Sequence, residues 1–308
     1  MDSKSLAQRQ SLPLEAKIVL SQNRIKEWHD MYHGNVYVSF SGGKDSTVLL
    51  HMVRQLYPNV VAVFVDTGLE FPEIRSFVKT FDNVVWLKPK MTFREVLSKY
   101  GYPVISKEVA RKIYEVEHTN SEVLIQTRMF GDMNGNGAMP EKWKFLLNAP
   151  FNVSHKCCDV MKKQPIYAYE KASKNKAFTG MMACDSALRK TSYIQHGCNN
   201  ISTARPMSSP LGFWLEEDIW EYIKKYNVQY CNVYDKGWTQ TGCMFCMFGV
   251  HMEKEPNRFQ RMSLTHPVTY KYCIEKLGLG KILDYIKVSY AIKNKECVDE
   301  RTTIVSQE

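Results

Sequence analysis

The sequence predicts an α/β protein with a doubly wound parallel sheet. Three short apolar runs rich in β-branched residues, at 36–40, 60–65 and 83–87, alternate with segments of helical periodicity. This β-α-β-α-β succession is typical of parallel strands joined by right-handed crossovers. Ligands of such sheets bind beyond the carboxyl ends of the strands, so the residues that follow each strand are the first candidates for a site.

Helical periodicity marks the segments around these strands. The expected helices are residues 14–31, 45–56, 72–80, 92–99, 109–129, 157–172, 218–225 and 271–292, the last broken at Gly278 and Gly280, and a further strand is expected at 177–182. We predict a nucleotide-binding α/β domain at residues 1–225. Residues 226–308 are predicted to be a helical, loop-rich C-terminal extension packed on it.

Composition and charge narrow the class of protein. The chain has 308 residues, 44% hydrophobic and 24% charged, as in globular proteins with a full core. No apolar run approaches ~18 residues and the N-terminus lacks the apolar core of a signal peptide, so we expect no membrane association and a cytoplasmic location. The net charge of +9 favours a polyanionic partner, a nucleotide or a nucleic acid, or else reflects an ordinary solvated surface.

The first strand runs into a glycine turn where a helix is expected to begin. Its sequence is Ser39-Phe-Ser41-Gly42-Gly43-Lys44-Asp45-Ser46. Backbone N–H groups at a helix N-terminus lack partners and favour an anion, and the glycines let the backbone approach a phosphate. Lys44 adds a cation, and Asp45 indicates a bound metal ion such as Mg²⁺. The spacing is neither that of a Walker loop nor that of a dinucleotide fingerprint.

Polar segments also follow two other predicted strands. They are Asp66, Thr67 and Gly68 after residues 60–65, and Asp185, Ser186 and Arg189 after residues 177–182. The first segment offers a carboxylate and backbone groups to a base or ribose, although alone it is an ordinary turn. The second suits a phosphate, or else caps a helix beside a surface arginine.

Nine cysteines without a secretion signal argue for metal or redox use and against disulfides. Four form two pairs, Cys157-Cys158 and Cys243-x-x-Cys246. Adjacent cysteines are unusual zinc ligands and soft thiolates suit iron–sulfur clusters, so a cluster is favoured over zinc, and both over buried free thiols. Cys297 lies in a charged tail, where it is either a nucleophile or without a role.

In order and spacing, these motifs resemble the adenosine-nucleotide α-hydrolase superfamily, and within it the 3'-phosphoadenosine 5'-phosphosulfate (PAPS) reductase family. The resemblance covers residues 14–279. It rests on the 41–46 loop and the later segments Asp66-Thr-Gly, Phe71-Pro-Glu, Gly180…Asp185-Ser…Arg189, Pro210-Leu…Trp214, Glu217-Asp-Ile-Trp, Tyr234-Asp-x-Gly and Gly242-Cys-x-x-Cys246.

The resemblance implies a fold and a site. Residues 39–46 would hold the pyrophosphate or sulfate-bearing end of an adenosine nucleotide, with Asp66, Thr67 and Gly68 near the adenosine. The paired cysteines resemble those of the family's [4Fe–4S] reductases, whose cluster sits beside the nucleotide. On this basis we also assign Asp185 and Ser186 to nucleotide binding, and Arg189 to catalysis with Lys44, Asp45 and Ser46.

Two departures separate this chain from the sulfonucleotide reductases. Those enzymes usually carry Ser-Gly-Ala-Glu-Asp, whereas this loop has the Ser-Gly-Gly-Lys-Asp-Ser form of members that cleave ATP to AMP and pyrophosphate. They also end in a Glu-Cys-Gly-Leu-His nucleophile segment, of which Glu296-Cys297-Val-Asp keeps only Glu-Cys. Both departures favour ATP.

The sequence therefore predicts an ATP-dependent adenylylating enzyme with a [4Fe–4S] cluster and Mg²⁺, acting in sulfur transfer to a nucleic acid or small molecule. A sulfur-donor protein is a further expected partner, and a homodimer is one of the oligomeric states that the sequence leaves undecided. One alternative is a PAPS or APS reductase that uses Cys297. The other is a nucleotide- and cluster-binding regulator without turnover.

Overall fold

The computed structural model describes residues 2–292, so Cys297 lies outside the described residues. The described chain divides into two compact units, with the boundary between Cys246 and Met247. This boundary lies later in the chain than residue 225, where we expected it. The Cys243–Cys246 segment consequently belongs to the first unit, together with the sheet.

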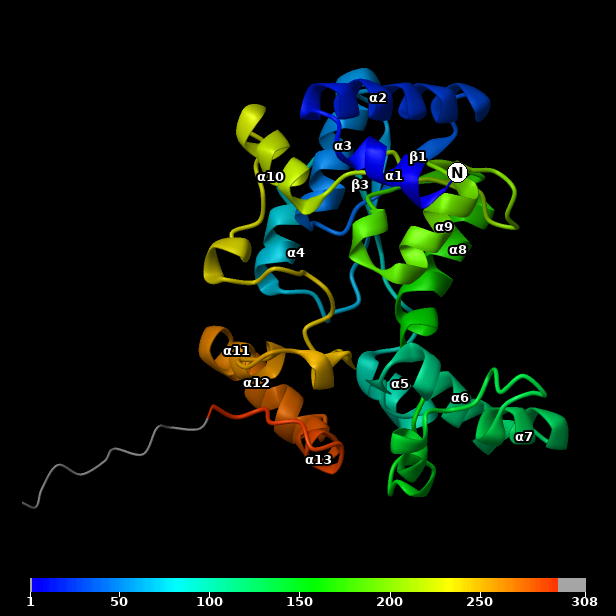
Figure 1. The fold of residues 1–308 in the computed structure, drawn as a ribbon. Helices are drawn as coiled ribbons and strands as arrows, with labels where there is room; N and C mark the ends of the chain where they lie inside the picture. Colours follow the sequence, from blue (N-terminus) through cyan, green and yellow to red (C-terminus); the bar gives the residue numbers. More distant parts are fainter. Residues whose placement is uncertain (1, 293–308) are drawn as a thin grey trace, which may run out of the picture. The chain divides into compact units, whose positions relative to one another are not determined.

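A sheet of six described strands forms the centre of the first unit (Figure 1). The strands are β1 (Val36–Ser39), β2 (Val61–Val65), β3 (Val84–Leu87), β5 (Lys176–Thr179), β6 (Asn199–Asn200) and β7 (Met207–Ser208), in the spatial order β3-β2-β1-β5-β7-β6. β6 runs antiparallel to β7, and the other pairings are parallel. The predicted doubly wound, mostly parallel sheet is thus confirmed.

The strand order reverses beside β1. The chain moves from β1 to β2 and β3 on one side, and later returns to place β5 on the other side, with Tyr37 of β1 in register with Val61 of β2 and with Ala177 of β5. Such a reversal opens a crevice at the carboxyl ends of the two central strands, where open α/β sheets bind ligands. The glycine turn after β1 and Gly180 after β5 meet there.

Helices surround the sheet of the first unit. They are α1 (Ser3–Gln10), α2 (Leu14–Met31), α3 (Lys44–Leu56), α4 (Pro72–Val78), α5 (Phe93–Tyr100), α6 (Lys107–His118), α7 (Glu122–Phe130), α8 (Gln164–Ser173), α9 (Ala187–His196) and α10 (Glu216–Lys225). Between them lie the short strand β4 (Val104–Ile105) and the helical turns η1 (Glu141–Asn148), η2 (Asp159–Lys163), η3 (Ala183–Asp185) and η4 (Tyr234–Lys236).

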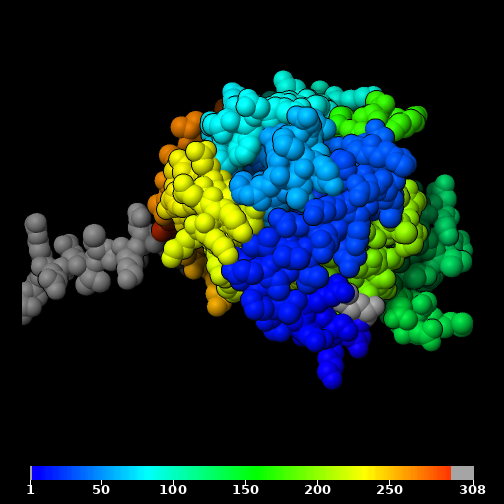
Figure 2. All heavy atoms as spheres, turned by 90° about the horizontal axis from the view of Figure 1, so that it is seen from above, coloured from blue at the N-terminus to red at the C-terminus, as the bar shows by residue number. Residues whose placement is uncertain are grey.

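Apolar packing and one buried ion pair hold these layers together. On one face, Ile166 of α8 packs against Tyr37 and Val63 of the sheet. At α2, Lys17 Nζ lies 2.6 Å from a carboxylate oxygen of Asp218 in α10, and both side chains are largely buried. Seen from above, α10 (yellow) lies directly beside the blue N-terminal helices (Figure 2). This contact brings residues near 216 to the start of α3.

The expected single helix over 109–129 is wrong. α6 ends at His118, Thr119 is extended, and α7 begins at Glu122. Ser121 causes the new start, because its hydroxyl accepts the Leu124 N–H at 3.3 Å and caps α7. The apolar periodicity continues across the break and hides it.

The second unit is mainly helical. It contains β8 (Met247–Phe248), η5 (Val250–Met252), α11 (Arg258–Thr265), α12 (Pro267–Lys271), η6 (Tyr272–Lys276) and α13 (Leu279–Tyr285). The expected helix over 271–292 is too long, since α13 already ends at Tyr285. Gly278, at φ 72°, does make the expected break. In neither unit is a described helix long and apolar enough to cross a membrane.

Candidate functional site

The turn between β1 and α3, residues 41–46, is a preformed loop that we call the phosphate loop. Ser46 Oγ accepts the Ser41 N–H at 3.2 Å and donates to the Gly43 carbonyl at 2.9 Å. Gly42 has φ 71°, and a Cβ there would lie 2.9 Å from the Ile74 side chain. The loop therefore needs glycine at this position to pack against α4. Ser39 ends β1, and Phe40 lies between it and the loop.

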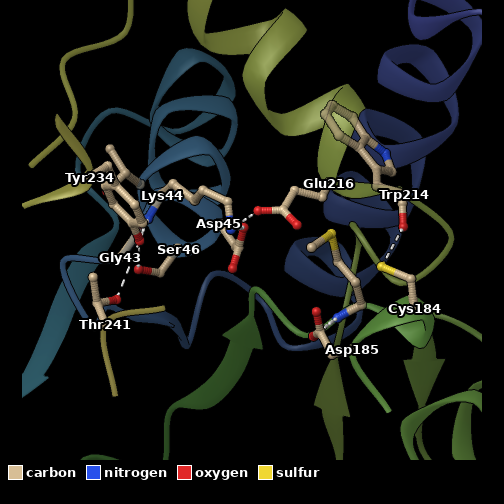
Figure 3. Close-up of polar contacts among 12 residues, drawn as sticks. Gly43, Lys44, Asp45, Ser46, Cys184, Asp185, Trp214, Glu216, Tyr234 and Thr241 are labelled. Carbon is tan, nitrogen blue, oxygen red and sulfur yellow. Dashed lines mark hydrogen bonds and ion pairs between the residues drawn. The ribbon is translucent and has the colours of Figure 1, made fainter. Parts of the chain in front are cut away.

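Lys44 begins α3 and is nearly buried, with 6% of its surface exposed. Its Nζ lies 3.2 Å from Asp45 Oδ1 and 3.2 Å from Glu216 Oε1, the latter at the start of α10 (Figure 3). Burial opposes the charge, but Asp45, Tyr234 and Glu216 outweigh it and raise the pKa of the Lys44 ammonium. Lys44 is thus a charged cation at neutral pH.

Asp45 shares this region with two other carboxylates. Burial raises the pKa of Asp45, Lys44 lowers it, and the charges of Asp185 and Glu216 raise it further. Asp185 arrives from the segment after β5, which can lie close because Gly180 has no side chain: a Cβ there would be 3.1 Å from the Ser46 nitrogen. Asp45 and Glu216 thus face the Lys44 cation, while Asp185, itself paired with Arg189, adds a third negative charge near Asp45. Sequence reasoning missed Glu216, which no local pattern marks.

Tyr234 covers the phosphate loop. Its hydroxyl accepts the Lys44 backbone N–H at 2.8 Å and lies 3.3 Å from Thr241 Oγ1 (Figure 3). A Cβ on Gly43 would lie only 2.6 Å from that Thr241 oxygen. The N–H that a phosphate would use at the start of α3 is therefore already taken by a tyrosine oxygen.

Replacing Tyr234 by phenylalanine should strengthen anion binding. The Tyr234→Phe variant loses the oxygen that competes for the Lys44 N–H, so Mg²⁺-pyrophosphate should bind up to about tenfold more tightly, the value of one hydrogen bond. Isothermal titration calorimetry measures this affinity. Tyr230→Phe is the matched control, because the Tyr230 hydroxyl donates to Asp235 instead, at 2.9 Å. Weaker binding to Tyr234→Phe would mean that this hydroxyl contacts the anion.

Glu216 should also weaken anion binding, because its carboxylate pairs with the Lys44 ammonium. In Glu216→Gln the Lys44 ammonium loses one of its two carboxylate partners, and since Glu216 is a largely exposed side chain the pair is worth about 0.2–1 kcal/mol. We expect pyrophosphate without metal to bind roughly two- to fivefold more tightly. The adjacent exposed Glu217→Gln serves as the control. Equal affinities for the two variants would show that Lys44 is not held by Glu216.

The turn after β2 satisfies its own polar groups. Asp66 Oδ2 pairs with Arg75 at 2.8 Å, and Asp66 Oδ1 accepts the Gly68 N–H at 3.2 Å. The Thr67 N–H and hydroxyl both donate to Glu70, at 2.9 and 2.8 Å. A buried Glu70 thus holds the turn that the sequence assigned to the nucleotide.

The two cysteine pairs come together in the first unit, and we call Cys157, Cys158, Cys243 and Cys246 the thiol site. Burial raises the pKa of the Cys157 thiol, and the negative charges of the other three thiolates raise it further. Burial also raises the pKa of Cys243 to about 11, against the opposing effect of Lys162. Four thiols from segments far apart in the chain therefore share one electrostatic environment.

Lys162 joins the thiol site to the turn after β2. It forms a hydrogen bond with Cys243, and its Nζ lies 3.9 Å from Glu70 Oε1. Burial opposes its charge, but Cys243 and Glu70 raise its pKa. The Met244 N–H also donates to the Leu69 carbonyl at 2.9 Å. The sequence analysis missed Lys162, although its place one helical turn after Cys158 is a readable signal.

Asp185, Ser186 and Arg189 form a helix start. Ser186 Oγ accepts the Arg189 N–H at 3.3 Å and caps α9, and the Arg189 guanidinium pairs with Asp185. Arg189 lines a cavity of about 100 Å³ together with Tyr193 and Cys198. Among the described residues the Arg189 guanidinium pairs with Asp185 and not with the phosphate loop, so its catalytic role stays a prediction.

Within residues 2–292, no three cysteine, histidine or carboxylate side chains lie close enough to hold one metal ion together. The thiol site nevertheless has the donors that a cluster needs, four soft thiols with the Lys162 ammonium to offset their negative charge. Its side chains would have to close around the cluster.

The fold and site define a doubly wound α/β protein with a glycine loop at the sheet's switch point and four thiols that share one electrostatic environment. The sequence model of the phosphoadenosine phosphosulfate reductase domain matches residues 35–123 and 84–248. The chain therefore belongs to the phosphoadenosine phosphosulfate reductase family.

Individual relatives match most of this chain. The chain is 24% identical over 251 residues to an adenosine 5'-phosphosulfate reductase of Staphylococcus haemolyticus, covering 78% of this chain and 81% of that protein. It is 25% identical over 261 residues to an uncharacterized protein of Methanocaldococcus jannaschii, covering 82% of this chain but only 51% of that protein. A PAPS reductase structure from Candida auris covers 79% of this chain and 96% of its own, at 17% identity and a TM-score of 0.44.

Proposed function

We propose that this protein is an ATP-using member of the family, which adenylylates an acceptor and releases pyrophosphate. The observation that carries the proposal is Lys44 between Asp45 and Glu216, with the Arg189-paired Asp185 as a third carboxylate near Asp45. Three carboxylates at an anion site repel a bare sulfonucleotide but suit a polyphosphate that arrives with Mg²⁺. The family's sulfur chemistry makes sulfur transfer the purpose of the activation.

In the proposed reaction an acceptor oxygen attacks the α-phosphorus of ATP. The new bond joins that oxygen to phosphorus, the bond from the α-phosphorus to its bridging oxygen breaks, and pyrophosphate leaves with the electron pair. The Lys44 ammonium, together with those N–H groups at the start of α3 that Tyr234 does not hold, stabilises the leaving charge. Asp45 helps hold Mg²⁺, and Ser46 keeps the loop in shape through its bond to the Gly43 carbonyl. The adenosine lies near Asp66, Thr67 and Gly68.

A [4Fe–4S] cluster would be held by Cys157, Cys158, Cys243 and Cys246. When bound, such a cluster supplies a site that carries or accepts sulfur. The chain's own part is to hold these thiols out of full contact with solvent, Cys157 being buried and the other three half-buried, with Lys162 offsetting their charge and facing Glu70. A nucleic acid or a small molecule would be the acceptor, with a sulfur-donor protein as the other partner.

A substrate comparison tests the proposal. Anaerobically purified protein is incubated with ATP and Mg²⁺, and separately with PAPS or APS and thioredoxin, while pyrophosphate and sulfite are measured. We expect pyrophosphate from ATP and no sulfite. Sulfite release would instead establish a reductase.

The reductase is the second candidate, because several relatives are named adenosine 5'-phosphosulfate reductase. In that mechanism Cys297 attacks sulfur, so Cys297→Ala would abolish turnover. A nucleotide-binding regulator is the third candidate, and it would bind nucleic acid in a salt-dependent manner without releasing pyrophosphate.

A further inference from the structure

Helix α7 carries an apolar surface that the first unit leaves uncovered. None of its residues is buried, and Val123 and Phe130 are 77% and 69% exposed. Met133, in the loop that follows, is fully exposed. In Figure 1 α7 lies at the outer end of the group formed by α5, α6 and α7, away from the sheet. Exposed apolar patches of this kind mark interaction sites.

Lysines lie over aromatic rings beside this surface. The Nζ atoms of Lys144, Lys142 and Lys156 each lie 5.2 Å from a ring centroid, that of Phe130, Trp143 and Tyr114 respectively. We call these six residues the lysine–aromatic strip. Side chains that alternate cations and π-faces are the usual platform for unpaired bases and their phosphates.

The strip includes residues of α6 and α7 and the segment that precedes the thiol site. Glu115 of α6 pairs with Arg128 of α7 at 2.6 Å, which holds the two helices side by side. Tyr114 of α6 contacts the His155 ring at 5.5 Å between centroids. Lys156 directly precedes Cys157. A strand bound along the strip would therefore reach the cysteines.

The charges on the strip leave cations available. Within the described residues, Glu141 is paired with Lys144 at 2.6 Å, whereas Lys142 and Lys156 form no ion pair and keep their ammonium groups over rings. The whole chain carries a net charge of +9. A partner must therefore complement both exposed rings and cations. A protein that docks on the apolar face of α7 alone would leave the lysines unexplained.

We propose that the lysine–aromatic strip binds single-stranded nucleic acid, with phosphates on Lys142 and Lys156 and a base stacked on the exposed Phe130 ring. A duplex offers no free base faces and should bind less well. This inference rests on the proposed function only in naming the bound strand as the acceptor. Its test uses no ATP, so the two can fail separately.

The test is fluorescence anisotropy of a labelled single-stranded RNA of mixed sequence with the full-length, anaerobically purified chain. Phe130→Leu keeps an apolar side chain but loses the ring, and should weaken binding roughly tenfold, whereas Phe130→Trp should keep it. Lys142→Ala should reduce the slope of log affinity against log salt by about 0.7. Lys4→Ala, an exposed lysine of α1, is the charge-matched control and should leave affinity nearly unchanged.

Two results would overturn the strip. They are wild-type RNA affinity in Phe130→Leu and equal binding of single strand and duplex. Pyrophosphate release from ATP without any RNA binding would leave the proposed function standing and remove the strip alone.

Discussion

Replacing Lys44 by alanine should lower kcat/KM for pyrophosphate release roughly 10²–10³-fold, the loss usually seen when one electrostatic contact to a developing charge is removed. The reason is geometric. Lys44 starts α3, where its ammonium and the helix N-terminus act on the same anion. Pyrophosphate release is measured with a coupled phosphate assay.

Two controls keep this prediction interpretable. Lys44 neutralises Asp45 and Glu216, so its removal also leaves these two carboxylates unpaired. The first control is Lys44→Arg, which keeps the charge and should retain more activity than Lys44→Ala. Lys224→Ala, an exposed lysine of α10, should behave like the wild type. Undiminished turnover in a folded Lys44→Ala protein would exclude Lys44 from the phosphate site.

Cys243→Ser should lose nearly all iron and acid-labile sulfide. Serine oxygen is a hard donor and a poor substitute for thiolate, and the variant also removes the hydrogen bond from Lys162. The measurement is iron and sulfide per chain, with the visible absorption spectrum, after anaerobic purification. Cys184→Ser, an exposed thiol outside the thiol site, should keep the wild-type content. A colourless wild-type protein that contains zinc would remove the cluster.

Local patterns predicted the fold and the phosphate loop well. The apolar strands at β1, β2 and β3 and the turn at Gly42 depend on neighbouring residues, so their period and glycine content reveal them. The start of α7 was missed because one capping residue, Ser121, interrupts an apolar period that otherwise continues. Local sequence patterns thus explain both the correctly predicted strands and glycine turn and the missed start of α7.

The rest of the site depends on distant contacts. Tyr234 and Glu216 reach Lys44 from positions far along the chain, and Lys162 meets Glu70 only after the sheet has formed. No spacing rule in the sequence connects such residues. Ser186 shows the opposite case, since its local pattern fits both a phosphate ligand and a helix cap, and the structure shows the cap.

A ligand bound at the thiol site would also raise the free energy of unfolding of the chain. Eighty-four residues separate Cys158 from Cys243, so a ligand bound by both pairs closes a long loop, as a disulfide would. Closing that loop restricts the unfolded chain, and a ligand that binds only the folded chain stabilises it further. The bound cluster would then stabilise the folded chain as well as take part in the reaction. Thermal unfolding of the iron-loaded wild type should begin at a higher temperature than that of Cys243→Ser.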